Sequence, residues 1–144
     1  MNQARVVGTV SAAVLETLGE DGNCYHSGDI IYLGDSNVNH MKKRHLSTWL
    51  KYKDKLPDII STPDYVGISD EDGSLEYVKV FSEHIKLVVR VAGDEKLYVR
   101  TMYTVLKSRT DYFIKSGRLK SLQSGRNSLQ CDYGLLFEDG NRQP

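Results

Sequence analysis

Three consecutive segments in the second half of this 144-residue chain constrain its fold more than any other feature. Each alternates apolar and polar side chains and is rich in Val, Leu, Ile and Tyr, which is typical of β-strands; they cover residues 75–81, 85–91 and 97–106. Gly-containing acidic runs at 69–73 and 93–95 are turn signals. Because the connections are short, we expect an antiparallel meander.

The remaining segments predict helices and one or two further strands. We expect strands at 6–10 and 29–33, and helices at 11–18, 37–52, 57–60 and 108–114. This order predicts an α+β fold with N-terminal helices packed on one face of a three- to four-stranded antiparallel sheet. We divide the chain into an N-terminal extension (1–28), an α+β domain (29–122) and a polar C-terminal tail (123–144).

The helix expected over 37–52 contains two of the four histidines, His40 and His45, with three consecutive cations between them. Residue 45 shares the helical spacing of the apolar stripe, which comprises Val38, Met41, Trp49 and Tyr52. His40 lies toward the other side, about 140° around the helix. The two imidazoles therefore need not contact the same atom.

Composition excludes several classes of protein. The length suits one domain, and no apolar run approaches the roughly 18 residues of a membrane span. The first residues do not resemble a secretory signal, and Cys24 and Cys131 form no CxxC pair, so we expect a reduced, cytoplasmic protein while leaving a single disulfide open.

The net charge of zero argues against a protein that coats nucleic acid, but the charges are unevenly distributed. Two basic segments, 40–53 and 99–126, flank an acidic one, 58–84. If the basic segments meet in space, they make a positive cleft for one anionic ligand. Scattered surface charge is the alternative.

The residue types match those needed to cleave RNA without a metal ion. Histidine exchanges protons near neutral pH, and Lys, Arg and hydroxyl groups stabilise charge on phosphoryl oxygens. The helix supplies His40, His45, Lys43 and Arg44, and the last strand and its end supply Arg100, Thr101, Tyr103, Thr104, Lys107 and Arg109. Simpler interpretations stay open: His45 as a core histidine, His40 as a solvent-exposed one, and Thr101 and Tyr103 as ordinary strand residues.

Other site chemistries fit less well. The five-residue spacing of the histidines and the isolated cysteines do not match zinc-site spacings. The chain has no GxxxxGK[ST] loop, no GxGxxG after a strand and no GxSxG elbow. We expect neither a metal nor a cofactor.

Several stretches resemble a known family. These are the run from Ile31 to His45 with its His-x-x-x-x-His helix, the run 56–67 with its Pro-Asp-Tyr-Val step, and the runs 78–81, 98–103 and 109–119. Together, over residues 29–122, they resemble phage-associated nuclease domains of the barnase–EndoU–colicin–RelE class.

The resemblance implies a metal-independent endoribonuclease in which a helix histidine and polar residues of later strands form the active site. Carried over to this chain, His40, His45, Thr101 and Tyr103 are the expected catalytic positions. Lys43 and Arg109 would bind phosphate, and Arg44, Arg100 and Lys107 join them as cations near the expected site.

Two hypotheses follow from the sequence. The first is a toxin-like ribonuclease of a phage or mobile element, whose 2′-hydroxyl attack leaves a 2′,3′-cyclic phosphate. Its partners would be RNA, with transfer RNA as one candidate, and a cognate immunity protein. The second is a non-catalytic phage protein that inhibits a host enzyme or defence complex through its acidic middle segment, Asp70-Glu71-Asp72 with Glu76 and Glu83.

Overall fold

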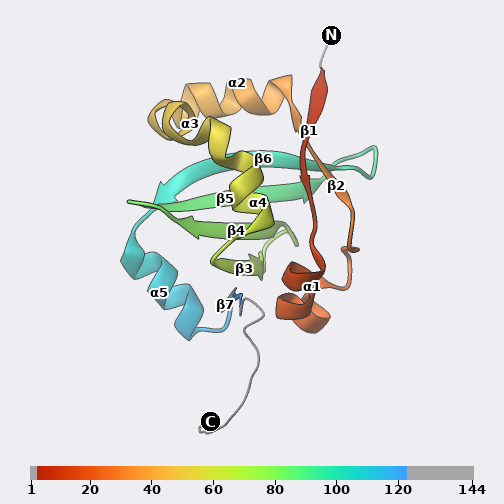
Figure 1. Ribbon diagram of the computed structural model, residues 1–144, viewed down its shortest axis with the longest axis vertical. Helices are drawn as coiled ribbons and strands as arrows, with labels where there is room; N and C mark the ends of the chain where they lie inside the picture. The colour runs from red at the N-terminus through yellow and green to blue at the C-terminus, as the bar shows by residue number, and fades with distance from the viewer. Residues whose placement is uncertain (1–2, 123–144) are drawn as a thin grey trace, which may run out of the picture.

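A computed structural model describes residues 3–122 of the chain (Figure 1). The elements are β1 (Ala4–Thr9), α1 (Ala12–Leu18), η1 (Gly19–Gly22), β2 (Ile30–Gly34), α2 (Asp35–Arg44), α3 (Leu46–Tyr52), η2 (Lys53–Lys55), α4 (Leu56–Ser61), β3 (Tyr65–Ile68), β4 (Leu75–Val80), β5 (His84–Val91), β6 (Leu97–Val105), α5 (Lys107–Lys115) and β7 (Leu119–Ser121). The α+β class and the meander β4-β5-β6 are confirmed.

The sheet is larger than the sequence predicts. Within residues 3–122 it has seven strands in the order β1-β2-β6-β5-β4-β3-β7, and it is mixed because β2 runs parallel to β6. The prediction of a three- to four-stranded antiparallel sheet is therefore wrong in size and direction. β3 and β7, only four and three residues long, are held mainly by pairing with their neighbours.

The two faces of the meander have different roles. One face packs into the main core, and its side chains are Leu75, Tyr77, Ile85, Leu87, Val89, Val99 and Met102. Helices α2, α3 and α4 contribute Met41, Trp49, Leu56, Ile59 and Ile60 to that core. The opposite face carries Glu76, Lys86, Thr101 and Tyr103, and α5 packs against part of it. The polar residues of the meander therefore gather away from the core.

The helix predicted over 37–52 is broken at His45. Its backbone has φ −142° and ψ 47°, so α2 ends before it and α3 begins after it. The His45 N–H donates to the Met41 carbonyl at 2.7 Å, and its own carbonyl accepts from the Trp49 N–H at 2.9 Å. Both helices thus fix the backbone of this one residue.

The first residues belong to the same sheet as the rest. β1 pairs antiparallel with β2, and α1 contributes Val14 and Leu18 to the core after its N-cap Ser11. The polar tail expected at 123–144, including Cys131, lies outside the described residues. No helix within residues 3–122 is long and apolar enough to cross a membrane.

Candidate functional site

The break between α2 and α3 directs His45 toward strand β6. Its imidazole stacks on the Tyr103 ring, with 5.5 Å between the ring centroids and 29° between the planes. The His40 ring meets His45 edge-on at 6.1 Å. His45 is half-buried and His40 is exposed. The expectation that His45 lies on the core stripe is wrong, because the helix break turns its side chain to the polar face of the sheet.

β6 can receive these histidines because most of its outer edge is unpaired. Among the described strands, β2 pairs only with Leu97 and Tyr98 of β6, and helices α2 and α3 also contact β6. The polar face of β6 is therefore within reach of side chains from the helices. Thr101 and Tyr103 lie there opposite Val88 and Lys86 of β5.

One cleft of about 430 Å³ contains the two histidines and these strand residues. It is lined by His40, His45, Ser69, Glu71, Asp72, Ser74, Glu76, Lys86, Val88, Arg100, Thr101, Tyr103, Arg109, Phe113 and Arg118. The lining holds four cations of Lys or Arg type and three carboxylates. The helix histidines and the last strand thus meet as expected.

Three cations surround a single aromatic ring at one side of the cleft. The Lys86 Nζ lies 5.3 Å from the Phe113 ring centroid, and the Cζ atoms of Arg109 and Arg118 lie at 4.7 and 4.8 Å. Cation–π attraction helps to hold these like charges together. Arg109 is exposed and forms no ion pair among residues 3–122, so it remains available to an anion.

Glu76 neutralises the other two cations at the floor. Its Oε2 is 3.3 Å from the Lys86 Nζ and accepts a hydrogen bond from the Arg118 NH2 at 3.1 Å. The side chains of Glu76 and Lys86 are only 7% and 9% exposed. A buried ion pair of this kind costs desolvation, so it is weak evidence for stability alone.

Several buried polar atoms of the cleft have no hydrogen-bond partner within the described part of the chain. Among them are Glu76 Oε1, Thr101 Oγ1 and Arg118 Nε. Buried polar groups are normally hydrogen-bonded, and unpaired ones call for an explanation. Their grouping in one cleft fits a site that is completed by a polar ligand.

His45 and Tyr103 are among the residues of the cleft whose pKa values are perturbed. Burial, together with the nearby His40 and Arg44, lowers the pKa of His45 below its usual value of 6.5. Burial and then the Glu76 carboxylate raise the pKa of Tyr103, against the opposing effect of three arginines. At pH 7 His45 is therefore a neutral proton acceptor and Tyr103 a protonated donor.

Some expected cations lie outside the cleft lining. Lys43 and Arg44 are exposed on α2, and Lys107 pairs with Asp111 at 2.8 Å on the surface. Arg44 is still close enough to affect the pKa of His45. A role for these three residues in binding RNA stays a prediction.

Glu76, Lys86, Phe113 and Arg118 were not identified as site residues from the sequence. The sequence signal that could have identified Glu76 and Lys86 as site residues is a charged residue within a strongly apolar strand. The two basic segments, 40–53 and 99–126, do not include Lys86.

No group of three or more His, Cys, Asp or Glu side chains is placed to hold a metal ion within residues 3–122. Comparison with known proteins gives one family. A family described as phage-Barnase-EndoU-ColicinE5/D-RelE like nuclease 3 matches residues 5–112, which include all of β1 except its first residue and end within α5. No curated protein and no solved structure matches the chain.

Proposed function

The chain belongs to the phage-Barnase-EndoU-ColicinE5/D-RelE like nuclease 3 family, and on this premise we propose that it is a metal-independent endoribonuclease. The observation that carries the proposal is the convergence of His40 and His45 with Tyr103 and four Lys or Arg cations in one cleft. Proton acceptors, a hydroxyl donor and phosphate ligands are the groups that transesterification of RNA requires.

In the proposed reaction, the neutral imidazole of His45 removes the proton from the ribose 2′-hydroxyl. The 2′-oxygen attacks the adjacent phosphorus, the bond from phosphorus to the 5′-oxygen breaks, and His40 protonates that leaving oxygen. The products are a 2′,3′-cyclic phosphate and a free 5′-hydroxyl. The lowered pKa of His45 supports its role as the base, because the imidazole must be unprotonated to accept the proton.

The remaining groups bind the phosphate as negative charge increases on its free oxygens. Arg109, which has no carboxylate partner among the described residues, supplies positive charge. The Tyr103 hydroxyl donates a hydrogen bond, and Glu76 Oε1, which lacks a donor, accepts one from a ribose hydroxyl. The substrate is RNA, because only RNA has the 2′-hydroxyl that this mechanism uses.

The test is incubation of the purified protein with total cellular RNA in EDTA, beside a His40→Ala/His45→Ala variant. We expect discrete cleavage by the parent, cyclic phosphate ends, and a loss of at least about a hundredfold in the variant. A His26→Ala variant is the control for loss of a histidine, because the His26 side chain is exposed and lies outside the cleft lining. Equal cleavage by the parent and the histidine variant would refute the assignment.

Intact RNA with a folded parent would favour the second hypothesis, a non-catalytic inhibitor of a host protein. Part of the acidic segment on which that hypothesis rests is engaged within the chain. Asp72 pairs with Arg100, Glu76 with Lys86 and Arg118, and Glu83 with Lys51. These carboxylates do not form a free acidic surface, so the structure adds no support to that alternative.

A further inference from the structure

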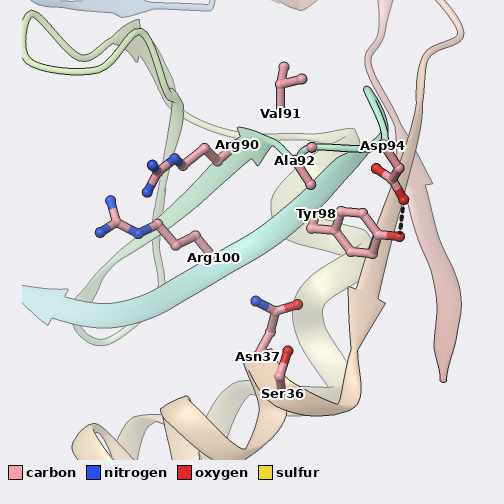
Figure 2. A pocket seen from close by; sticks show the side chains of 9 residues that line it. Ser36, Asn37, Arg90, Val91, Ala92, Asp94, Tyr98 and Arg100 are labelled. Atoms are coloured by element: carbon pink, nitrogen blue, oxygen red, sulfur yellow. Dashed lines mark hydrogen bonds between the residues drawn. The ribbon is translucent and has the colours of Figure 1, made fainter. Parts of the chain in front are cut away.

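A second hollow adjoins the cleft on the same face of the sheet (Figure 2). Its volume is about 570 Å³, and it is lined by Ser36, Asn37, Arg90, Val91, Ala92, Gly93, Asp94, Tyr98 and Arg100. Arg100 lines both the hollow and the cleft. The two sites are therefore contiguous at this residue.

A β-bulge joins the two sites on one face. The register of β5 and β6 shifts between Val88 and Val89. Val88 pairs with Thr101 and Val89 pairs with Val99, so Arg100 is the extra residue of β6. Side chains alternate along a regular strand, so Tyr98 and Tyr103 would otherwise face opposite sides of the sheet. The inserted residue places Tyr98 on the face that carries Thr101 and Tyr103.

On β5 the residues that line the two sites also lie on one face, without a bulge. Lys86, Val88 and Arg90 occupy alternate positions opposite Tyr103, Thr101 and Tyr98. Helix α2 also extends from one site to the other. Asn37 near its start lines the hollow, and His45 just after its end lines the cleft. Eight residues of helix correspond to about 12 Å, so the two sites can hold different nucleotides of one strand.

The chemistry of the hollow is that of a phosphate and base subsite. Figure 2 shows the Arg90 and Arg100 guanidinium groups pointing to the same side of the strands. Asp72 pairs with Arg100 at 3.3 Å, whereas Arg90 forms no ion pair among residues 3–122. Arginine binds phosphate oxygens with its planar, forked set of donors.

The aromatic part of the hollow is fixed and partly exposed. The Tyr98 hydroxyl donates to Asp94 Oδ2 at 2.9 Å, and the Lys96 N–H donates to the other oxygen of that carboxylate at 2.9 Å. Asp94 is thus engaged and does not compete for Arg90. The Tyr98 ring packs on Tyr32 with 5.7 Å between centroids, which holds it as a platform on which a base can stack.

We propose that this hollow binds the nucleotides that flank the cleaved phosphate of a single-stranded RNA, with a flanking phosphate on Arg90 and Arg100 and a base on Tyr98. This inference rests on the proposed ribonuclease function. It makes the substrate a strand of several nucleotides that lies along β6 and across both sites. Base stacking and charge neutralisation give affinity with little sequence preference.

The experiment measures binding and cleavage separately. Binding uses a fluorescent, random-sequence 2′-O-methyl RNA decamer, which lacks the attacking hydroxyl, titrated at several salt concentrations. Cleavage uses a mixture of dinucleoside monophosphates, which fill only the cleft, and an unmodified RNA decamer. The variants are Arg90→Ala, Tyr98→Leu and, as a matched control on exposed β1, Arg5→Ala.

We expect Arg90→Ala to weaken decamer binding about tenfold and to reduce the slope of log affinity against log salt by about 0.7. Tyr98→Leu should weaken binding with an unchanged slope, because stacking involves no phosphate charge. Both variants should cleave dinucleotides like the parent, and Arg5→Ala should match the parent in every assay.

The outcomes separate the two proposals. A parent that cleaves both substrates, with Arg90→Ala unchanged on the decamer, would overturn the subsite and leave the ribonuclease proposal standing. A parent that cleaves neither substrate but binds the decamer more tightly than Arg90→Ala does would overturn the catalytic proposal and leave the hollow as a site that binds single-stranded RNA. A parent that does not bind the decamer overturns the subsite.

Discussion

Replacing Glu76 with glutamine should destabilise the fold by more than the loss of a surface charge would. The substitution keeps the size of the side chain and removes the negative charge beside Lys86, whose side chain is 9% exposed. The Lys86 ammonium would then remain buried with only the Phe113 ring as a favourable neighbour among the described contacts. Removal of one partner of a buried ion pair leaves an uncompensated charge, which is the costly case.

The magnitude follows from burial. Breaking a buried pair costs about 3–5 kcal/mol, and we expect the lower end, about 3 kcal/mol, because Arg118 is 20% exposed and keeps contact with solvent. For a domain of this size, that corresponds to a decrease in Tm of roughly 10 °C. The free energy of unfolding would be measured by urea denaturation, with the slope against urea checked for constancy.

A double-mutant cycle isolates the charge term. Lys86→Met removes the buried cation, so Glu76→Gln/Lys86→Met should be more stable than the sum of the single changes predicts, by about 1–3 kcal/mol. Glu83→Gln is the control, because Glu83 pairs with Lys51 at the surface and its loss should change Tm far less. A Glu76→Gln variant within 1 kcal/mol of the parent, or an additive double variant, would refute the reasoning.

Three further predictions concern pH, the tyrosine and one glycine. The pKa of His45 is lower in the folded protein than in the unfolded chain, so the unfolded chain binds the proton more tightly. The free energy of unfolding should therefore decrease as the pH falls through 6.5 toward the folded-state pKa. His45→Ala should remove that part of the pH dependence in urea titrations at pH 5 to 8. Tyr103→Phe keeps the ring that stacks on His45 but removes the hydroxyl, so kcat on RNA should fall roughly tenfold or more with little change in Tm. A Cβ at Gly67 would lie 2.2 Å from the Arg118 carbonyl oxygen, so Gly67→Ala should cost about 1–3 kcal/mol by thermal unfolding, whereas Gly93→Ala, with open space around it, should not.

The parts of the fold that follow from local patterning could be predicted from the sequence. The alternation in 75–106 predicted the meander, and the Pro at the start of α4 predicted that helix. β3 and β7 could not be found in this way, because strands of four and three residues carry too few alternating positions. Their pairing with each other and with β4 holds them in place.

The site was predicted as a set of residue types, but its geometry depended on two backbone irregularities. Continuous helical spacing over 37–52 gave no sign of the break at His45, and that break turns its imidazole to Tyr103. Similarly, regular alternation along β6 hides the bulge at Arg100. A periodic pattern of apolar and polar residues records neither irregularity.

The pairing of β2 with β6 affects when activity can arise during synthesis. Ile31 of β2 pairs with Leu97 of β6, although the two residues are far apart in the sequence. The cleft is lined by residues that precede β6, such as His40 of α2, and by residues that follow it, such as Phe113 of α5. Contacts between residues so far apart in sequence form late, because a long loop must close first. A nascent chain that has not yet released β6 and α5 from the ribosome therefore has its histidines but no cleft. Under the ribonuclease proposal, the protein could therefore not cleave the RNA that surrounds it during translation until residues up to Arg118 are free to fold.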